Sequence, residues 1–163
     1  DWVDEVRQWS TFGMKNSRWS DKSGTNAKMH EYSAAIILAS LDSWEETRKT
    51  WIKLKRLALQ VSHTNQLQVH PAMQKVYASS YWIIQTSDEM ISLIERIFGE
   101  MQIETRRWWE LGCHQMKVFE NTERFSLLQT DILARETLGL PFHLYLTDSD
   151  FSKIHDALET CLS

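Results

Sequence analysis

Glycine and proline are scarce in this chain, and this scarcity restricts its fold more than any other feature does. The 163 residues include only five glycines and two prolines. Sandwiches, barrels and doubly wound sheets need many tight turns, which require the backbone angles that glycine and proline favour. The sequence therefore argues against a β-rich fold and favours helices.

Helical periodicity and capping signals place the expected helices along the chain. Capping boxes, in which a Ser or Thr is followed three residues later by an acid, begin at Ser43, Thr86 and Thr147. Gly112 and Gly139 are typical of helix ends. Apolar residues at helical spacing then predict helices over 1–10, 27–41, 43–61, 71–84, 86–112, 118–139 and 147–161.

These elements predict an all-α fold, a single-domain helical bundle of about six or seven helices over residues 1–163. Residues 10–26 read as a long loop, residues 62–70 as a second loop and residues 139–147 as an extended connection. Residues 32–41 carry no charge, so we expect their helix to be buried at the centre of the bundle.

Charge and targeting signals limit where the protein acts. The net charge of −4 gives no overall attraction for phosphate polymers, and the longest apolar stretch is too short to span a membrane. No Asn-X-Ser/Thr acceptor occurs, which favours the cytoplasm or a host that does not glycosylate. Because the first residue is Asp, an N-terminal targeting segment could be missing from view.

Arg107 and His114 are candidate catalytic residues, because positions seven apart share a helix face. A guanidinium can hold a phosphate while an imidazole moves a proton. Over these eight residues the sequence resembles the Arg-x(4–6)-His signature of the HEPN-type helical ribonucleases. The resemblance implies metal-independent RNA cleavage by Arg107 and His114. Otherwise the two are an ordinary surface arginine and a histidine.

A basic patch on the expected helix 43–61 is a candidate nucleic-acid contact. It consists of Arg48, Lys49, Lys53 and Arg56. A solvated helix face or a contact with an acidic partner explains the same residues and is the favoured interpretation. The six histidines form no metal-binding motif, and no signature of a cofactor occurs, so neither a metal nor a cofactor is predicted.

Tryptophan is unusually frequent, with eight residues in the chain. Those on apolar helix faces suit a core, whereas Trp2, Trp9, Trp19 and Trp109 are candidate contacts for a partner, because indoles often anchor interfaces.

The sequence as a whole predicts a non-enzymatic interaction module or accessory subunit that binds a protein partner or forms a homo-oligomer through aromatic-rich surfaces. The alternatives are the HEPN-like ribonuclease and a bundle cavity that binds an apolar ligand.

Overall fold

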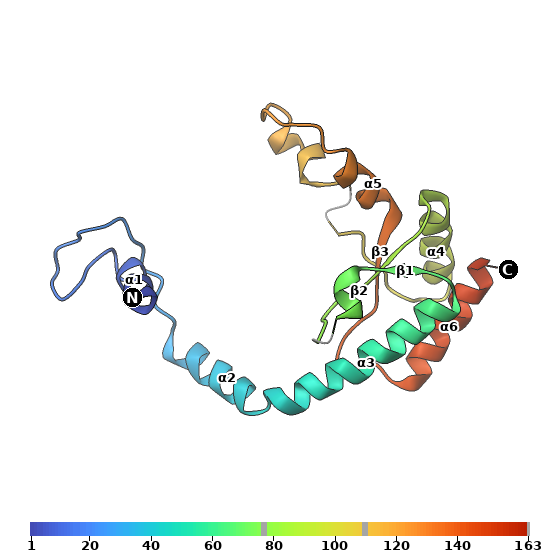
Figure 1. Cartoon of the computed structure of the whole chain (residues 1–163), viewed down its shortest axis with the longest axis horizontal. Helices are drawn as coiled ribbons and strands as arrows, with labels where there is room; N and C mark the ends of the chain where they lie inside the picture. The colour runs from blue at the N-terminus through green and yellow to red at the C-terminus, as the bar shows by residue number, and fades with distance from the viewer. Residues whose placement is uncertain (76–77, 109–110, 163) are drawn as a thin grey trace. The chain divides into compact units, whose positions relative to one another are not determined.

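A computed structural model describes residues 1–75, 78–108 and 111–162 (Figure 1). In chain order the elements are α1 (Trp2–Trp9), α2 (Glu31–Asp42), α3 (Trp44–Thr64), β1 (Gln68–Val69), a 3-10 helix (Pro71–Gln74), β2 (Trp82–Gln85), α4 (Asp88–Glu100), two 3-10 helices (Cys113–Gln115 and Lys117–Phe119), α5 (Leu128–Glu136), β3 (Thr137–Leu140) and α6 (Asp148–Leu162). The chain forms two compact units, Asp1–Glu45 and Glu46–Ser163.

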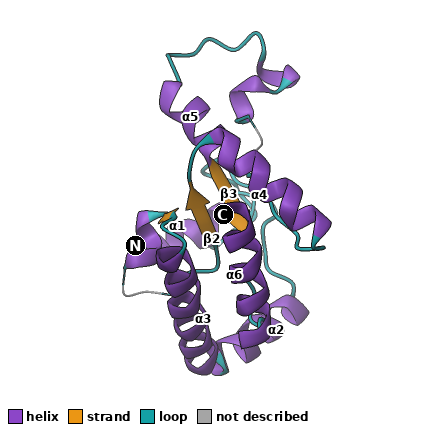
Figure 2. Ribbon diagram, turned by 90° about the vertical axis from the view of Figure 1, so that its right-hand side faces the viewer, coloured by secondary structure: helices purple, strands orange, loops and turns teal. Residues whose placement is uncertain are grey.

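The second unit is built on a three-stranded antiparallel sheet in the order β1-β2-β3 (Figure 2). Trp82 pairs with Leu140, and Ile84 pairs with Leu138 on one side and Val69 on the other. Along β2, Trp82 and Ile84 are buried, whereas the alternate residues are half-buried. This alternation is typical of a sheet with one covered face.

The prediction of an all-α bundle is therefore wrong. Scarce glycine did not exclude a sheet, because these strands are short and are not joined by tight turns. A 3-10 helix lies between β1 and β2, and α4 and α5 lie between β2 and β3. Such connections do not need the special backbone angles of a two-residue hairpin.

Two predicted helices are replaced by other structure. The expected helix 71–84 is a 3-10 helix at Pro71–Gln74 and the strand β2, while residues 76–77 lie outside the described residues. The expected helix 118–139 is replaced by the end of a 3-10 helix, the short α5 and the strand β3. β2 is rich in Trp and Ile, which suit a pleated, half-buried surface, and pairing with β3 decides between helix and strand.

Several helices form where capping and periodicity predicted them. α1, α3 and α6 closely match their expected ranges. At the start of α6, Thr147 N donates to Asp150 Oδ2 at 2.8 Å, and Asp150 N donates to Thr147 Oγ1 at 3.3 Å, completing the predicted capping box. α4 ends at Glu100 instead of Gly112, because Gln102 adopts a left-handed φ of 55°.

The core of the second unit lies between the sheet, α3, α4 and α6. Its fully buried side chains include Trp82, Phe98, Ile91, Ile94 and Leu158. α4 packs against α6, and the helices lie side by side in Figures 1 and 2. Phe151, Ile154, Leu158 and Cys161 of α6 are buried in this core.

The first unit contains α1, the loop 10–26 and α2, and few of its side chains are buried. The Gln8 side chain is buried and donates from Nε2 to the carbonyl of Gly13 at 2.9 Å. The expectation that α2 lies at the centre of a bundle is wrong, because none of its residues is buried. Its uncharged stretch instead leaves Ile36, Leu38 and Leu41 exposed.

Candidate functional site

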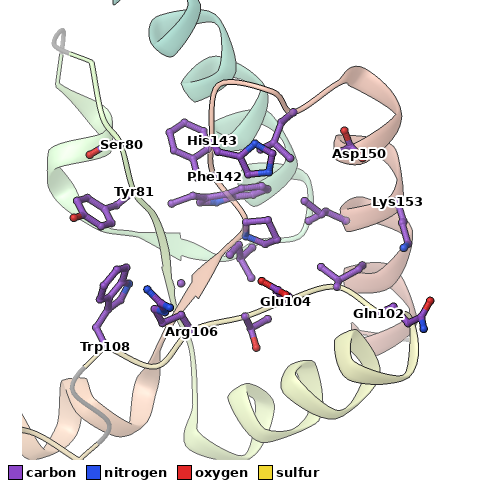
Figure 3. A pocket seen from close by; sticks show the side chains of 18 residues that line it. Ser80, Tyr81, Gln102, Glu104, Arg106, Trp108, Phe142, His143, Asp150 and Lys153 are labelled. Carbon is purple, nitrogen blue, oxygen red and sulfur yellow. The ribbon is translucent and has the colours of Figure 1, made fainter. Parts of the chain in front are cut away.

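A cavity of about 710 Å³ opens beside the sheet of the second unit (Figure 3). Its walls come from the residues that precede and begin β2, the segment Gln102–Trp108 after α4, the end of β3 with the loop that follows, and the first turns of α6. Four separate parts of the chain therefore meet at one opening.

The floor of the cavity is apolar and rigid. It includes Trp82, whose indole Nε1 donates to Ser62 Oγ on α3 at 2.9 Å in the core. The Trp82 ring lies 6.5 Å from that of Phe142 and 5.8 Å from that of Phe151, measured between ring centroids. These contacts fix the floor to the core, because an indole with both a hydrogen bond and ring neighbours has few alternative positions.

One wall of the cavity is an aromatic pair, Tyr81 and Trp108. Their ring centroids lie 5.2 Å apart with an interplanar angle of 80°, and the Arg106 Cζ lies 5.2 Å from the Trp108 ring centroid. Gly139 allows this approach, because a Cβ at that position would lie 2.8 Å from the Trp108 Nε1. Arg106 and Gly139 also exchange two backbone hydrogen bonds, of 2.8 and 2.9 Å, which fix this wall to β3.

Charged groups of both signs face the cavity, and Figure 3 shows Arg106, Glu104, Lys153 and Asp150 around it. Asp150 is held by Thr147, which lowers the pKa of its carboxyl by hydrogen bonding, and the nearby charges of His143 and Lys153 lower that pKa further. Arg106, Glu104 and Lys153 have no ion-pair partner among the residues that the structure describes. These three side chains are available to a polar ligand.

None of these cavity residues was singled out as functional by the sequence. The segment after Gly139 was predicted to be extended, whereas the strand is β3, Thr137–Leu140, and residues 137–139 were predicted to end a helix. Arg106 and Trp108 lie in the stretch that periodicity assigned to a helix. The pairing of residues 82–85 with 137–140 and the bridge between Arg106 and Gly139 bring three of the walls together, and no single local pattern carries that information.

Arg107 is part of a structural ion pair. Its Nε and Nη2 donate to the Glu95 carboxylate on α4 at 2.8 to 3.0 Å, and Asp88 lies 3.9 Å from Nη1. Hydrogen bonding to Glu95 is the main reason why the pKa of Arg107 is raised. The guanidinium thus fixes the segment after α4 to that helix.

His114 has a different carboxylate partner, on α5. Its Nε2 lies 2.8 Å from Asp131 Oδ1, and the side chain is largely buried. The hydrogen bond from His114 is the main cause of the lowered pKa of Asp131. Arg107 and His114 therefore contact carboxylates on separate helices, and neither side chain is the hydrogen-bond partner of the other.

The candidate partner residues lie mainly in the first unit. Trp2 is 85% exposed and Trp19 is 77% exposed. Trp2 and Trp9 line an apolar cavity of about 640 Å³ together with Val6. Trp109 lies outside the described residues. A role of the three described tryptophans in binding a partner stays a prediction.

The basic patch lies on the first half of α3. Lys49 forms an ion pair of 2.9 Å with Glu46, whereas Lys53 and Arg56 are exposed and Arg48 is half-buried. Its role in nucleic-acid binding stays a prediction. No helix in the described part of the chain combines the length and apolarity that crossing a bilayer requires.

A helix-covered sheet with a polar cavity beside it defines an α/β protein. The sequence model of the DegT/DnrJ/EryC1/StrS aminotransferase family matches residues 1–159. The chain belongs to this family. No curated protein sequence matches it.

Solved structures share the fold at low sequence identity. A candidate PLP-dependent aminotransferase from Bacillus cereus ATCC 10987 has a TM-score of 0.86 and 22% identity, over 96% of this chain and 44% of that one. A DegT DnrJ EryC1 StrS aminotransferase from Brucella abortus has a TM-score of 0.79 and 19% identity, over 97% and 43%. DesI, solved with its TDP-sugar product, has a TM-score of 0.74 and 24% identity, over 96% and 41%.

The chain thus spans less than half the length of these structures. The prediction of a non-enzymatic interaction module is wrong, because the family is one of aminotransferases. The two alternative predictions, a ribonuclease and a bundle cavity for an apolar ligand, are wrong as well. Their premises were a helix joining Arg107 to His114 and a helical bundle. Among the described residues, 107–108 and 111–112 lie outside any helix, and the second unit is built on a three-stranded sheet.

Proposed function

We propose that this chain is part of an aminotransferase that transfers an amino group from an amino acid to the keto group of a sugar. The family match over residues 1–159 carries this proposal. The sugar is suggested by the TDP-sugar product bound to DesI, which shares the fold. The lining of the cavity beside the sheet suits a polar ligand. Arg106, Glu104 and Lys153 face this cavity and form no ion pair with another described residue.

The cofactor proposed for the reaction is pyridoxal phosphate, by analogy with the Bacillus cereus neighbour. When bound, it supplies the electron sink for amino transfer. Such a site needs a lysine for the Schiff base, an acidic or basic partner for the ring nitrogen, and donors for the phosphate.

The described residues do not fit this cofactor. Lys153 and Asp150 lie three residues apart on one helix, and the Asp150 carboxylate already accepts two hydrogen bonds from Thr147. α6 begins with Asp148 and Asp150, whose charges disfavour a phosphate there. The buried Lys55 donates to the backbone carbonyl of Lys75. We therefore assign the cofactor to the part of the family fold that these residues do not cover.

An amino-transfer assay tests the proposal on the natural full-length protein that carries this sequence. With pyridoxal phosphate, glutamate and a panel of nucleotide-linked keto sugars, we expect one 2-oxo acid to form for each ketone that becomes an amine. Mass spectrometry of both products measures this stoichiometry. A protein that binds the cofactor but forms neither product from any sugar would contradict the proposal.

The proposed compartment is the cytoplasm, and the proposed assembly is a homo-oligomer. Both cysteines, Cys113 and Cys161, are free thiols, as is usual in a reducing compartment. The exposed Trp2, Trp9 and Trp19 suit contacts between copies. Native mass spectrometry measures the number of copies, and a monomer at all concentrations would contradict the homo-oligomer.

A further inference from the structure

We propose that the contact between Asn65 and His155, which joins the end of α3 to α6, is a pH-sensitive switch. It forms with the neutral histidine ring and breaks when the ring takes up a proton. Asn65 is the first residue after α3, and its Nδ2 lies 2.9 Å from the His155 Nδ1 on α6. The two residues are 90 positions apart in sequence, so the contact joins distant parts of the second unit.

The side-chain amide of Asn65 determines which form of His155 can make this contact. Asn65 is 6% exposed, and its Nδ2 also donates to the carbonyl of Val61 at 2.8 Å. A carbonyl oxygen only accepts hydrogen bonds, so the amide must turn Nδ2, and not Oδ1, toward Val61. The other hydrogen of Nδ2 is therefore the one that His155 Nδ1 accepts. A ring nitrogen accepts a hydrogen bond only while it carries no proton, so the contact requires the neutral ring with its hydrogen on Nε2.

Protonation of His155 places two donors against each other. A charged imidazole carries a hydrogen on both nitrogens and has no acceptor left. Turning the Asn65 amide over would offer Oδ1 to the ring, but it would also bring that oxygen against the carbonyl of Val61. A buried polar group that loses its partner destabilises the fold. Because histidine side chains change charge between about pH 5 and pH 8, mild acid is the expected trigger.

The charged groups around His155 lie on its own helix. Glu159 Oε1 lies 3.4 Å from His155 Nε2, and Asp148 lines the same hollow of about 270 Å³ between α3 and α6. Within the described chain no charged residue of α3 or α4 lines this hollow, and His63 in the last turn of α3 is exposed. The residues that α3 contributes are all uncharged: Leu57, Gln60, Val61 and Thr64.

Glu159 opposes the switch, because a nearby carboxylate favours the charged form of a histidine. The side chain of Glu159 is 65% exposed, however, and water screens an exposed ion pair strongly. The contact with Asn65 is buried and is screened much less. Loss of the buried contact therefore decides the response to acid.

The switch lies beside the residue that anchors the floor of the cavity. Leu67 N donates to the carbonyl of Ser62 at 2.9 Å, so the chain that follows Asn65 folds back on the last turn of α3. Gln66 in this turn has a left-handed φ of 54°, a conformation that persists only where the surrounding contacts hold it. Ser62 Oγ accepts the indole N–H of Trp82 in the cavity floor. Breaking the switch is therefore expected to loosen the turn that positions Ser62.

Urea unfolding of this chain at about pH 8 and about pH 5.5 tests the proposal. His155→Gln stays neutral at both pH values and can still accept from Asn65 through Oε1. We expect acidification to raise the unfolding equilibrium constant of the parent about threefold to tenfold more than that of His155→Gln. His63→Gln is the matched control, because it removes an exposed histidine from the last turn of α3, and it is expected to respond like the parent.

Asn65→Asp is expected to reverse the sign of the response. An aspartate accepts a hydrogen bond from the charged ring, so acidification should stabilise this variant relative to the double variant Asn65→Asp/His155→Gln. Because Asn65→Asp also loses the hydrogen bond to Val61, it is expected to be less stable than the parent at neutral pH.

Two measurements on the parent do not depend on a substituted Asn65. Nitrogen-15 NMR of the His155 ring at about pH 8 should show an unprotonated Nδ1 and a protonated Nε2. Hydrogen exchange at about pH 5.5 should show less protection of residues 62–67 in the parent than in His155→Gln.

The proposal is overturned if the parent and His155→Gln respond equally to acid, or if His63→Gln loses the response as His155→Gln does. It is also overturned if the neutral ring carries its hydrogen on Nδ1, or if residues 62–67 are equally protected in the two proteins.

Discussion

The hydrogen bond between Trp82 and Ser62 joins the sheet to α3 in the middle of the core, since both side chains are about 1% exposed. Ser62→Ala removes the acceptor and leaves a buried indole N–H without a partner. We expect unfolding free energy to fall by about 1–3 kcal/mol. Urea unfolding measures it.

Ser152→Ala is the matched control for Ser62→Ala. Ser152 is exposed on α6, and its hydroxyl donates to the carbonyl of Asp148 at 3.1 Å. Its removal is expected to change the unfolding free energy by less than about 0.5 kcal/mol. Equal losses in the two variants would show that the buried hydrogen bond contributes nothing specific.

The contact between Asp131 and His114 makes stability depend on pH. The pKa of Asp131 is lowered in the folded protein, chiefly by the hydrogen bond from His114. A carboxyl with a lowered folded pKa stabilises the protein above its unfolded pKa of about 3.9, and this stabilisation is lost as the pH falls through the folded pKa.

Asp131→Asn tests this pH dependence. The variant is expected to unfold at a lower temperature than the parent near pH 6, and the difference is expected to shrink as the pH falls below about 4. Calorimetric melting temperatures across this range measure the difference. A difference that stays constant with pH would mean that the charge of Asp131 is not involved.

Packing between elements depends on Gly139. Because this residue has no Cβ, the strand β3 and the segment after α4 come close enough to form the cavity wall. In Gly139→Ala the new Cβ would lie 2.8 Å from the Trp108 Nε1 and 3.1 Å from the Arg106 carbonyl oxygen. We expect a loss of about 1–3 kcal/mol of stability, because the backbone carbonyl cannot move freely. The tryptophan fluorescence should also shift as Trp108 is displaced.

Gly99→Ala is the control for Gly139→Ala. Gly99 lies in α4, and among the described residues no atom outside the adjacent residues and the backbone of this helix lies within 4 Å of a Cβ added there. Alanine restricts the unfolded chain and favours the helix, so we expect a gain of about 0.5–1 kcal/mol. Chemical unfolding of both variants gives the comparison. A gain in Gly139→Ala would show that the wall is not closely packed.

The sequence predicts those elements whose signals are local. The capping box from Thr147 to Asp150 and the apolar face of α6 are confirmed because the residues concerned lie within a few positions of each other. β2 and β3 were missed because pairing Trp82 with Leu140 spans 58 positions, and the strands are only four residues long. The candidate site depends on that pairing, so its residues could not be predicted.

At the scale of the whole molecule, the two units differ in how much apolar surface they bury. The buried hydrophobic core among the described residues lies entirely between Leu54 and Cys161, in the second unit. In the first unit, α2 buries no residue and exposes Ile36 and Leu38. Ordering each residue costs about 1–2 kcal/mol, which burial at about 25 cal/mol per Å² has to offset.

We therefore expect amide hydrogens of α2 to exchange rapidly in the isolated 163-residue chain, and those of α4 and α6 to exchange only with unfolding of the second unit. Hydrogen exchange with mass spectrometry measures both. In the natural full-length protein α2 should be protected, because relatives of this fold have more than twice this length and an uncharged helix face suits burial. Protection of α2 in the isolated chain would contradict the prediction. If that protection disappeared on dilution, a second copy of the chain would be what covers the helix.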